Sequence, residues 1–149
     1  MRFTKPLLLL LLLSGFIFGG CKKNTTSTCN GVPVTAVSIS IDLTLPQNNP
    51  LTVNGGSEIF YGGYANYGVM VYRYTSSQFN AFDCTCPYDG TKNSKAIVAV
   101  QKSALTATCP VCGSVFVLAD GSVSHGPATC GLKRYNTNYD GVSNVTVSN

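Results

Sequence analysis

The chain has 149 residues, of which ten are Lys or Arg, six are Asp or Glu and one is His, and its formal net charge is +4. No run of adjacent basic residues is longer than two, whereas nucleic-acid binding needs a broad positive surface. One histidine and six acids also leave little material for acid–base catalysis. The composition therefore predicts neither a nucleic-acid partner nor an enzyme.

The first 20 residues have the pattern of a secretory signal. Two basic residues lead into seven consecutive leucines at 7–13, and small residues precede Cys21. The apolar stretch is too short to span a bilayer as a helix. We therefore expect residues 1–20 to be a signal peptide, so that the exported chain begins at Cys21.

Cys21 follows Gly19 and Gly20, and small residues directly before a cysteine resemble a bacterial lipobox. The resemblance implies that Cys21 becomes the acylated first residue of the mature chain, which anchors the protein in membrane lipid without a transmembrane span. The polar residues 22–30 then form a tether. We expect a lipoprotein of the cell envelope, in the periplasm or at the outer membrane. The alternative is simple cleavage and release, with Cys21 as a spare thiol.

From residue 32 onward the pattern is typical of β-strands. Apolar and polar residues alternate through 32–45, which would place one face against a core and the other in water. Asp120-Gly121 and Asp140-Gly141 suit tight hairpins, because Gly accepts a positive φ. The sequence predicts one all-β domain over 31–149, a small antiparallel barrel or sandwich. Its other expected strands are short runs rich in Val, Ile, Thr and aromatic residues, at 68–74, 79–83, 96–100, 105–108, 114–118 and 132–136.

Four cysteines form two short clusters, Cys84-x-Cys86 and Cys109-x-x-Cys112, separated by 22 residues. Two loops that point paired cysteines at one centre supply four thiolates, which suit tetrahedral zinc or a [2Fe–2S] cluster. In an exported chain, however, an even number of cysteines favours disulfides. Zinc, a cluster and disulfides all stay open on this pattern alone.

Two further cysteines, Cys29 and Cys130, remain once both clusters and Cys21 are set aside. A disulfide between them would tie the tether to the domain and stabilise the fold by about 2–4 kcal/mol. We expect to find this pair joined in the oxidised protein.

The residues around the clusters carry a more specific pattern. The chain reads Cys86-Pro87-Tyr88, then Cys109-Pro110-Val111-Cys112-Gly113-Ser114-Val115-Phe116, and later Gly126-Pro127-Ala128. This order resembles the Rieske iron–sulfur domains, which carry Cys-x-His in one loop, Cys-x-x-His before Gly-Ser-x-Phe in a second, and a Gly-Pro-Ala loop over the cluster. The resemblance implies a Rieske-like fold over residues 31–149 and a [2Fe–2S] cluster between two cysteine-bearing loops.

Both histidine positions of the family pattern are altered, because Tyr88 and Cys112 stand there. A phenol gives up its proton reluctantly, so we expect Tyr88 to pack beside the loop. Cys84 would replace the lost ligand, since residues i and i+2 of a strand project to the same side. Four thiolates would move the potential toward about −400 mV, below the Rieske range of about −150 to +300 mV. The predicted metal ligands are Cys84, Cys86, Cys109 and Cys112.

The resemblance also implies roles for two neighbours of the cluster. Ser114 occupies the position whose hydroxyl donates to a cluster sulfide. His125 is the only histidine and directly precedes the Gly-Pro-Ala loop, so it would lie close enough to hydrogen-bond or ligate the cluster.

The expected function is that of a membrane-anchored, Rieske-like electron-transfer module that serves a redox protein partner and performs no chemistry on a substrate itself. The compartment argues against a cluster, because clusters are built in the cytoplasm and Arg2 stands alone where folded export requires twin arginines. The alternative function is a structural or surface lipoprotein with the same fold, whose cysteines bind zinc or form disulfides.

Overall fold

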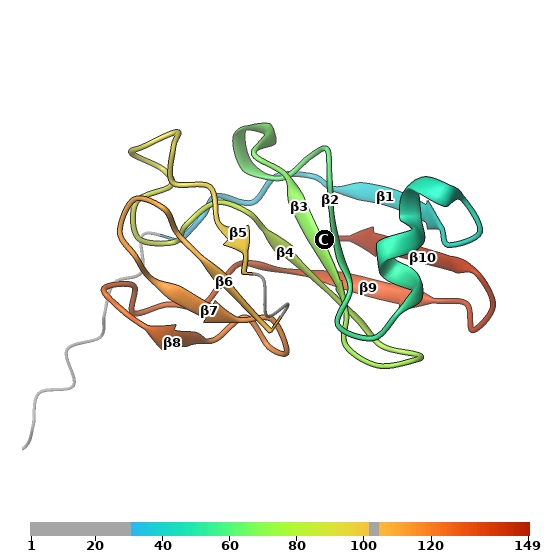
Figure 1. Cartoon of the computed structure of the whole chain (residues 1–149). Helices are drawn as coiled ribbons and strands as arrows, with labels where there is room; N and C mark the ends of the chain where they lie inside the picture. The colour runs from blue at the N-terminus through green and yellow to red at the C-terminus, as the bar shows by residue number, and fades with distance from the viewer. Residues whose placement is uncertain (1–30, 102–104) are drawn as a thin grey trace, which may run out of the picture.

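The computed structural model describes residues 31–101 and 105–149, and these residues form two antiparallel sheets (Figure 1). The expected signal peptide, the tether, Cys21 and Cys29 lie outside the described residues. Among the described residues there is no helix long and apolar enough to cross a membrane. The only helical elements there are two 3-10 helices, η1 (Pro46–Thr52) and η2 (Tyr64–Asn66).

The larger sheet has six strands in the order β1-β10-β9-β4-β3-β2. Strand β10, which was not predicted, alternates across the sheet: Val145 and Val147 are buried between exposed neighbours. The predicted run at 32–45 forms a shorter strand, because the chain turns at Leu43 and enters η1. The six strands are β1 (Ser38–Asp42), β2 (Ser57–Phe60), β3 (Val69–Arg73), β4 (Phe79–Asp83), β9 (Arg134–Tyr139) and β10 (Asn144–Ser148).

The smaller sheet is inserted between two adjacent strands of the larger one. The chain leaves after β4 and returns at β9, and these two strands pair antiparallel through Phe82 and Arg134. The N–H of Asp83 also donates to the carbonyl of Lys133 (2.8 Å), so the insertion begins and ends at one place. The four inserted strands, in the order β5-β6-β7-β8, are β5 (Ala99–Val100), β6 (Thr106–Thr108), β7 (Val115–Val117) and β8 (Val123–His125).

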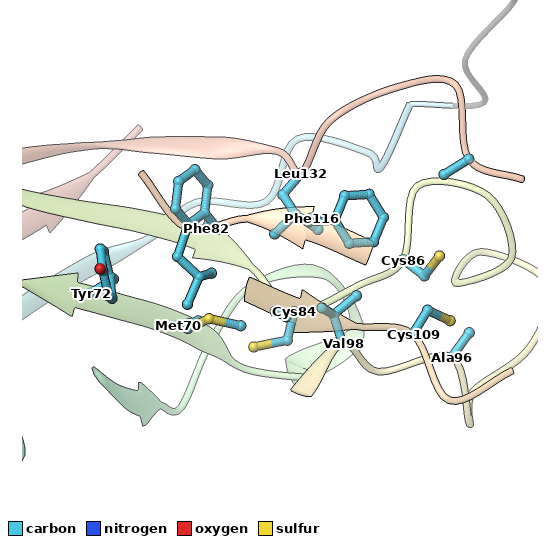
Figure 2. Close-up of a cluster of buried hydrophobic side chains, with 13 residues drawn as sticks. Met70, Tyr72, Phe82, Cys84, Cys86, Ala96, Val98, Cys109, Phe116 and Leu132 are labelled. Atoms are coloured by element: carbon cyan, nitrogen blue, oxygen red, sulfur yellow. The ribbon is translucent and has the colours of Figure 1, made fainter. Parts of the chain in front are cut away.

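Strand β3, which lies between β4 and the edge strand β2, is buried on both faces and contributes side chains to two cores. Side chains alternate across a strand, so Val69 and Val71 enter the core within the larger sheet, with Ile41 and Val145. Between them, Met70 faces the other way and joins the core that lies between the two sheets. Figure 2 shows this second core, to which β4 adds Phe82, β7 adds Phe116, and the two cysteine loops add Cys86 and Cys109.

Candidate metal centre

The first cysteine loop follows β4 and closes tightly around Cys86. The N–H of Cys86 donates to the carbonyl of Ala96 (3.0 Å), and the N–H of Gly90 donates to the carbonyl of Cys86 (2.8 Å). A Cβ at Gly90 would lie 2.3 Å from Thr85 Cγ2 and 2.7 Å from the Cys86 carbonyl oxygen. Only glycine permits this close approach, so Gly90 sets the shape of the loop.

The second cysteine loop joins β6 to β7. The N–H of Gly113 donates to the carbonyl of Cys109 (3.0 Å), and the N–H of Cys109 donates to the carbonyl of Ser114 (2.9 Å). Gly113 has a φ of +76°, which favours glycine at the end of such a turn. The turn buries Cys109 and leaves Cys112 partly exposed.

The two loops bring three sulfurs together. The Sγ atoms of Cys86, Cys109 and Cys112 all lie within 4.8 Å of one another, and those of Cys86 and Cys112 are 3.6 Å apart. Thiolates are the ligands that zinc, Cu(I) and iron–sulfur clusters prefer. Three of the four sulfurs named as ligands from the sequence therefore converge at one point.

The fourth, Cys84, does not join them. Figure 2 shows its sulfur pointing away from Cys86 and Cys109, into the core beside Met70. The rule that residues i and i+2 share a side holds for one extended strand, but β4 ends before Cys84. The N–H of Cys84 donates to the carbonyl of Gly68, whereas that of Cys86 donates to Ala96. The chain thus changes its pairing partner between the two cysteines and turns their side chains apart.

The pKa values of three of these thiols depart from the ordinary value, in a direction that follows their burial and hydrogen bonds. Burial, together with the charge of Asp83, raises the pKa of Cys84 to about 12. Burial likewise raises the pKa of Cys86 to about 12. At Cys112 burial opposes ionisation, but hydrogen bonds with Ser114 outweigh it and hold the pKa of this thiol below its ordinary value. The solvent-facing thiol is therefore the one that ionises most easily.

The buried Cys84 thiol should make the stability of the chain depend on pH. We expect the free energy of unfolding to fall as the pH rises from about 9 to about 12, because the unfolded chain releases this proton at its ordinary pKa of 9.0 while the folded chain keeps it. Urea unfolding at several pH values measures the effect. Cys84→Ala should reduce the slope and leave the part due to Cys86, whose pKa is also raised to about 12. An unchanged slope in this variant would contradict the assignment.

Ser114 connects the second cysteine loop to the Gly-Pro-Ala loop. The side chain of Ser114 is fully buried, and its Oγ accepts a hydrogen bond from the N–H of Ala128 (2.8 Å). The same Oγ lies 3.1 Å from Cys112 Sγ. Since the oxygen already accepts from the amide, its own proton is free to be donated to the Cys112 thiolate. The role expected of Ser114 from the sequence resemblance, donation to a cluster sulfide, stays a prediction.

Ser114→Ala should both loosen the loop and change the centre. Loss of the hydroxyl leaves the buried N–H of Ala128 unpaired, which costs about 1–3 kcal/mol of stability. It also removes a hydrogen bond to a sulfur, which should lower the reduction potential of a cluster bound there. Chemical unfolding and voltammetry measure the two effects. Ser124→Ala, on the exposed strand β8, is the control and should leave both unchanged.

Two other residues named from the sequence are exposed. His125 lies on β8 opposite Val115, and among the described residues no hydrogen bond joins it to a cysteine. Tyr88 is 49% exposed and so packs only partly beside its loop. The role of His125 at a cluster therefore stays a prediction.

Cys130 is disulfide-bonded, whereas Cys84, Cys86, Cys109 and Cys112 are free thiols. Its predicted partner, Cys29, lies outside the described residues, so the pairing of these two cysteines stays a prediction.

Asp83 is a buried acid that the sequence reasoning missed. One carboxylate oxygen accepts hydrogen bonds from the Tyr135 hydroxyl (2.7 Å) and the Tyr64 N–H (2.8 Å). The other accepts from the Thr85 N–H (2.8 Å) at the start of the first cysteine loop. The only signal in the sequence is an acid that ends an apolar strand directly before Cys84. Asp83 thus fixes the point at which the chain leaves the larger sheet.

No protein-family model matches the chain, and no curated protein matches it significantly. Two solved structures share its fold. The plasma membrane Rieske protein PetC3 from Synechocystis PCC 6803 is 20% identical, with 78% of this chain and 99% of that chain covered and a TM-score of 0.52. A chain in the complex of reduced oxygenase and oxidized ferredoxin in carbazole 1,9a-dioxygenase is 18% identical, with 76% and 94% covered and a TM-score of 0.50. These similarities confirm the predicted fold class, all-β and Rieske-like.

Proposed function

We propose that this chain is an electron-transfer module whose metal centre is held by Cys86, Cys109 and Cys112. The observation that supports the proposal is the convergence of these three free thiols at the tips of two neighbouring loops in a Rieske-like fold. The buried Ser114, which contacts both Cys112 and the Gly-Pro-Ala loop, supports the same site. The chain itself performs no chemistry on a substrate and passes electrons to a redox protein.

The proposed cofactor is a [2Fe–2S] cluster, which supplies a one-electron couple when it is bound. The kind of donor fits, because such clusters are held by thiolates. The number of converging thiolates is three, one fewer than the sequence predicts, because the buried Cys84 sulfur points elsewhere. The fourth ligand of this cluster would therefore not be a cysteine of the two motifs. A set richer in thiolate than the Rieske set would lower the potential.

A second candidate function is a structural or surface lipoprotein that binds one zinc ion, and the compactness of the trio favours it. Ligands at about 2.3 Å from one ion lie about 4 Å apart. The three sulfurs fall close to that spacing, at 3.6 Å for one pair and within 4.8 Å for all. Sulfurs on two different irons would be more widely separated, since each iron takes its own pair.

Metal and acid-labile sulfide analysis distinguishes these functions. The protein should be purified from its native envelope without chelator, and its visible spectrum recorded. Two irons and two sulfides per chain with a red-brown colour support electron transfer. One zinc without sulfide supports the structural function. A colourless protein without metal would contradict both and leave the three thiols as a remnant.

The proposal includes an anchor in the cell envelope through acylated Cys21. We expect Cys21→Ser to release the protein from membranes, because burial of the acyl chains in lipid supplies the free energy of membrane binding. Fractionation of membranes and soluble extract measures the release. Cys29→Ser, in the same segment, is the control and should leave the protein membrane-bound. Membrane association that survives Cys21→Ser would contradict the lipoprotein assignment.

A further inference from the structure

A hollow of about 390 Å³ opens where β4 and β9 stop pairing. The two strands pair only at Ala81–Tyr135 and Phe82–Arg134. Beyond these pairs the Thr137 hydroxyl donates to the carbonyl of Phe79, so a side chain replaces the backbone ladder and the strands separate. The volume is within the range of small-molecule sites, about 300–1,000 Å³. The hollow lies at the opposite end of β4 from Cys86, on the order of 20 Å along the extended chain.

A buried asparagine holds an arginine at the edge of this hollow. Asn80 is only 4% exposed, and its Nδ2 donates to the carbonyls of Leu118 (3.3 Å) and Ala119 (2.7 Å). These two bonds fix the amide, because the reversed orientation would turn Oδ1 against two carbonyl oxygens. Oδ1 therefore faces Arg134 and accepts a hydrogen bond from its guanidinium. The Asn80 amide, itself held by two backbone carbonyls, thus fixes one edge of the Arg134 guanidinium.

The rest of the Arg134 guanidinium is available to a ligand. Among the described residues it makes no other hydrogen bond and no ion pair within 4.0 Å. Asp120 lies near enough to feel its charge, but one Asp120 carboxylate oxygen accepts from the N–H of Ser122 (2.9 Å). Within the part of the chain that the structure describes, no acid lines the hollow itself. A guanidinium with a free edge is the preferred partner of a carboxylate, which it binds through two parallel hydrogen bonds.

Aromatic and polar side chains form the other walls. Tyr74, which is 48% exposed, and Tyr139 both line the hollow, and the Tyr139 hydroxyl donates a hydrogen bond to the carbonyl of Val142 (2.9 Å). The Arg73 guanidinium lies 6.0 Å from the centre of the Tyr139 ring. The site thus combines one cation that has a free edge with aromatic rings and uncharged polar side chains, and a single cation suits a singly charged ligand better than a phosphate.

We propose that this hollow binds an aromatic carboxylate, with the carboxylate on Arg134 and the ring against Tyr74. The ligand is a free aromatic acid or the C-terminal aromatic residue of a partner chain, which share this chemistry. The site is independent of the metal centre, because it uses none of the residues of the cysteine loops.

Titration of the full isotope-labelled chain with 4-hydroxybenzoate, followed by NMR, tests the proposal. Saturable shifts of the amides of Asn80 and Thr137 are expected. Arg134→Gln should weaken binding about tenfold or more, since it removes the charge-assisted pair. Tyr74→Ala should weaken it less. Lys92→Gln, an equal loss of charge on an exposed loop at the other end, is the control and should bind normally.

Two further ligands complete the test. The neutral 4-hydroxybenzamide should bind about tenfold more weakly than the acid if the carboxylate is recognised. A short peptide ending in tyrosine, with a free or an amidated C-terminus, separates the two sources: tighter binding of the free-ended peptide than of 4-hydroxybenzoate indicates a partner chain. Equal binding of acid and amide, normal binding by Arg134→Gln, or no saturable shift would overturn the proposal.

Discussion

Replacing Cys109 by serine is expected to abolish metal binding at the proposed centre. Cys109 is buried, and its Sγ lies within 4.8 Å of the two other converging sulfurs. A serine hydroxyl is a poor ligand for a soft metal, and only two thiolates would remain. The affinity for the metal should fall by more than the roughly 10–100-fold that loss of an outer partner of a ligand costs, so the purified variant should hold little metal. Elemental analysis and the visible spectrum of the purified variant measure the loss.

Cys84→Ala is the matched control for this variant. It removes another buried thiol from the same two motifs, but one whose sulfur points into the core between the sheets. We expect the metal content to stay at the wild-type level. If Cys84→Ala lost the metal as completely as Cys109→Ser, the four-cysteine ligand set predicted from the sequence would be restored and the three-thiol centre would be wrong.

Asp83→Ala should cause a large loss of stability for a substitution outside the apolar core. The variant leaves three donors without their acceptor: the Tyr135 hydroxyl and the N–H groups of Tyr64 and Thr85. Buried donors left unpaired cost about 1–3 kcal/mol each, and relaxation of the exposed loops recovers part of this. We expect the free energy of unfolding to fall by about 3–5 kcal/mol, which chemical denaturation measures.

Tyr135→Phe removes only the side-chain hydroxyl among the three donors to the Asp83 carboxylate. It removes one of the three hydrogen bonds and keeps the buried ring, so it should cost about 0.5–1.5 kcal/mol. A loss as large as that of Asp83→Ala would show that the Tyr135 hydroxyl carries the whole effect. A negligible loss in both variants would show that Asp83 does not anchor the loop.

The sequence predicts the parts of the fold that depend on local pattern. The expected strands at 68–74 and 79–83 correspond to β3 and β4, and the Asp-Gly pairs turn as predicted, with φ of +79° at Gly121 and +83° at Gly141. The strands β2, β8 and β10 were not among the predicted ones. β8 has three residues, too few for alternation to be visible, and the predicted strand at 96–100 is reduced to the two residues of β5.

In the candidate site, too, the features that depend on neighbouring residues can be predicted and those that depend on distant residues cannot. The turn that holds Cys109 and Cys112 follows from their spacing and from Gly113, all within one short segment. The direction of Cys84 does not, because it depends on Gly68, which lies on a different part of the chain and pairs with its backbone. Asp83 is similar: its partner Tyr135 is distant in sequence, so no local pattern marks it.

The insertion of the smaller sheet affects how the sequence of this protein can evolve. The chain enters the smaller sheet at Asp83 and leaves it at Lys133, and a backbone hydrogen bond joins these two residues. The adjacent pair, Phe82 and Arg134, belongs to the ladder between β4 and β9. Substitutions in the two cysteine loops therefore leave the register of the six-stranded sheet untouched. Residues of the two cysteine loops can therefore change while the scaffold is kept. Selection can thus act on the loops and on the architecture separately.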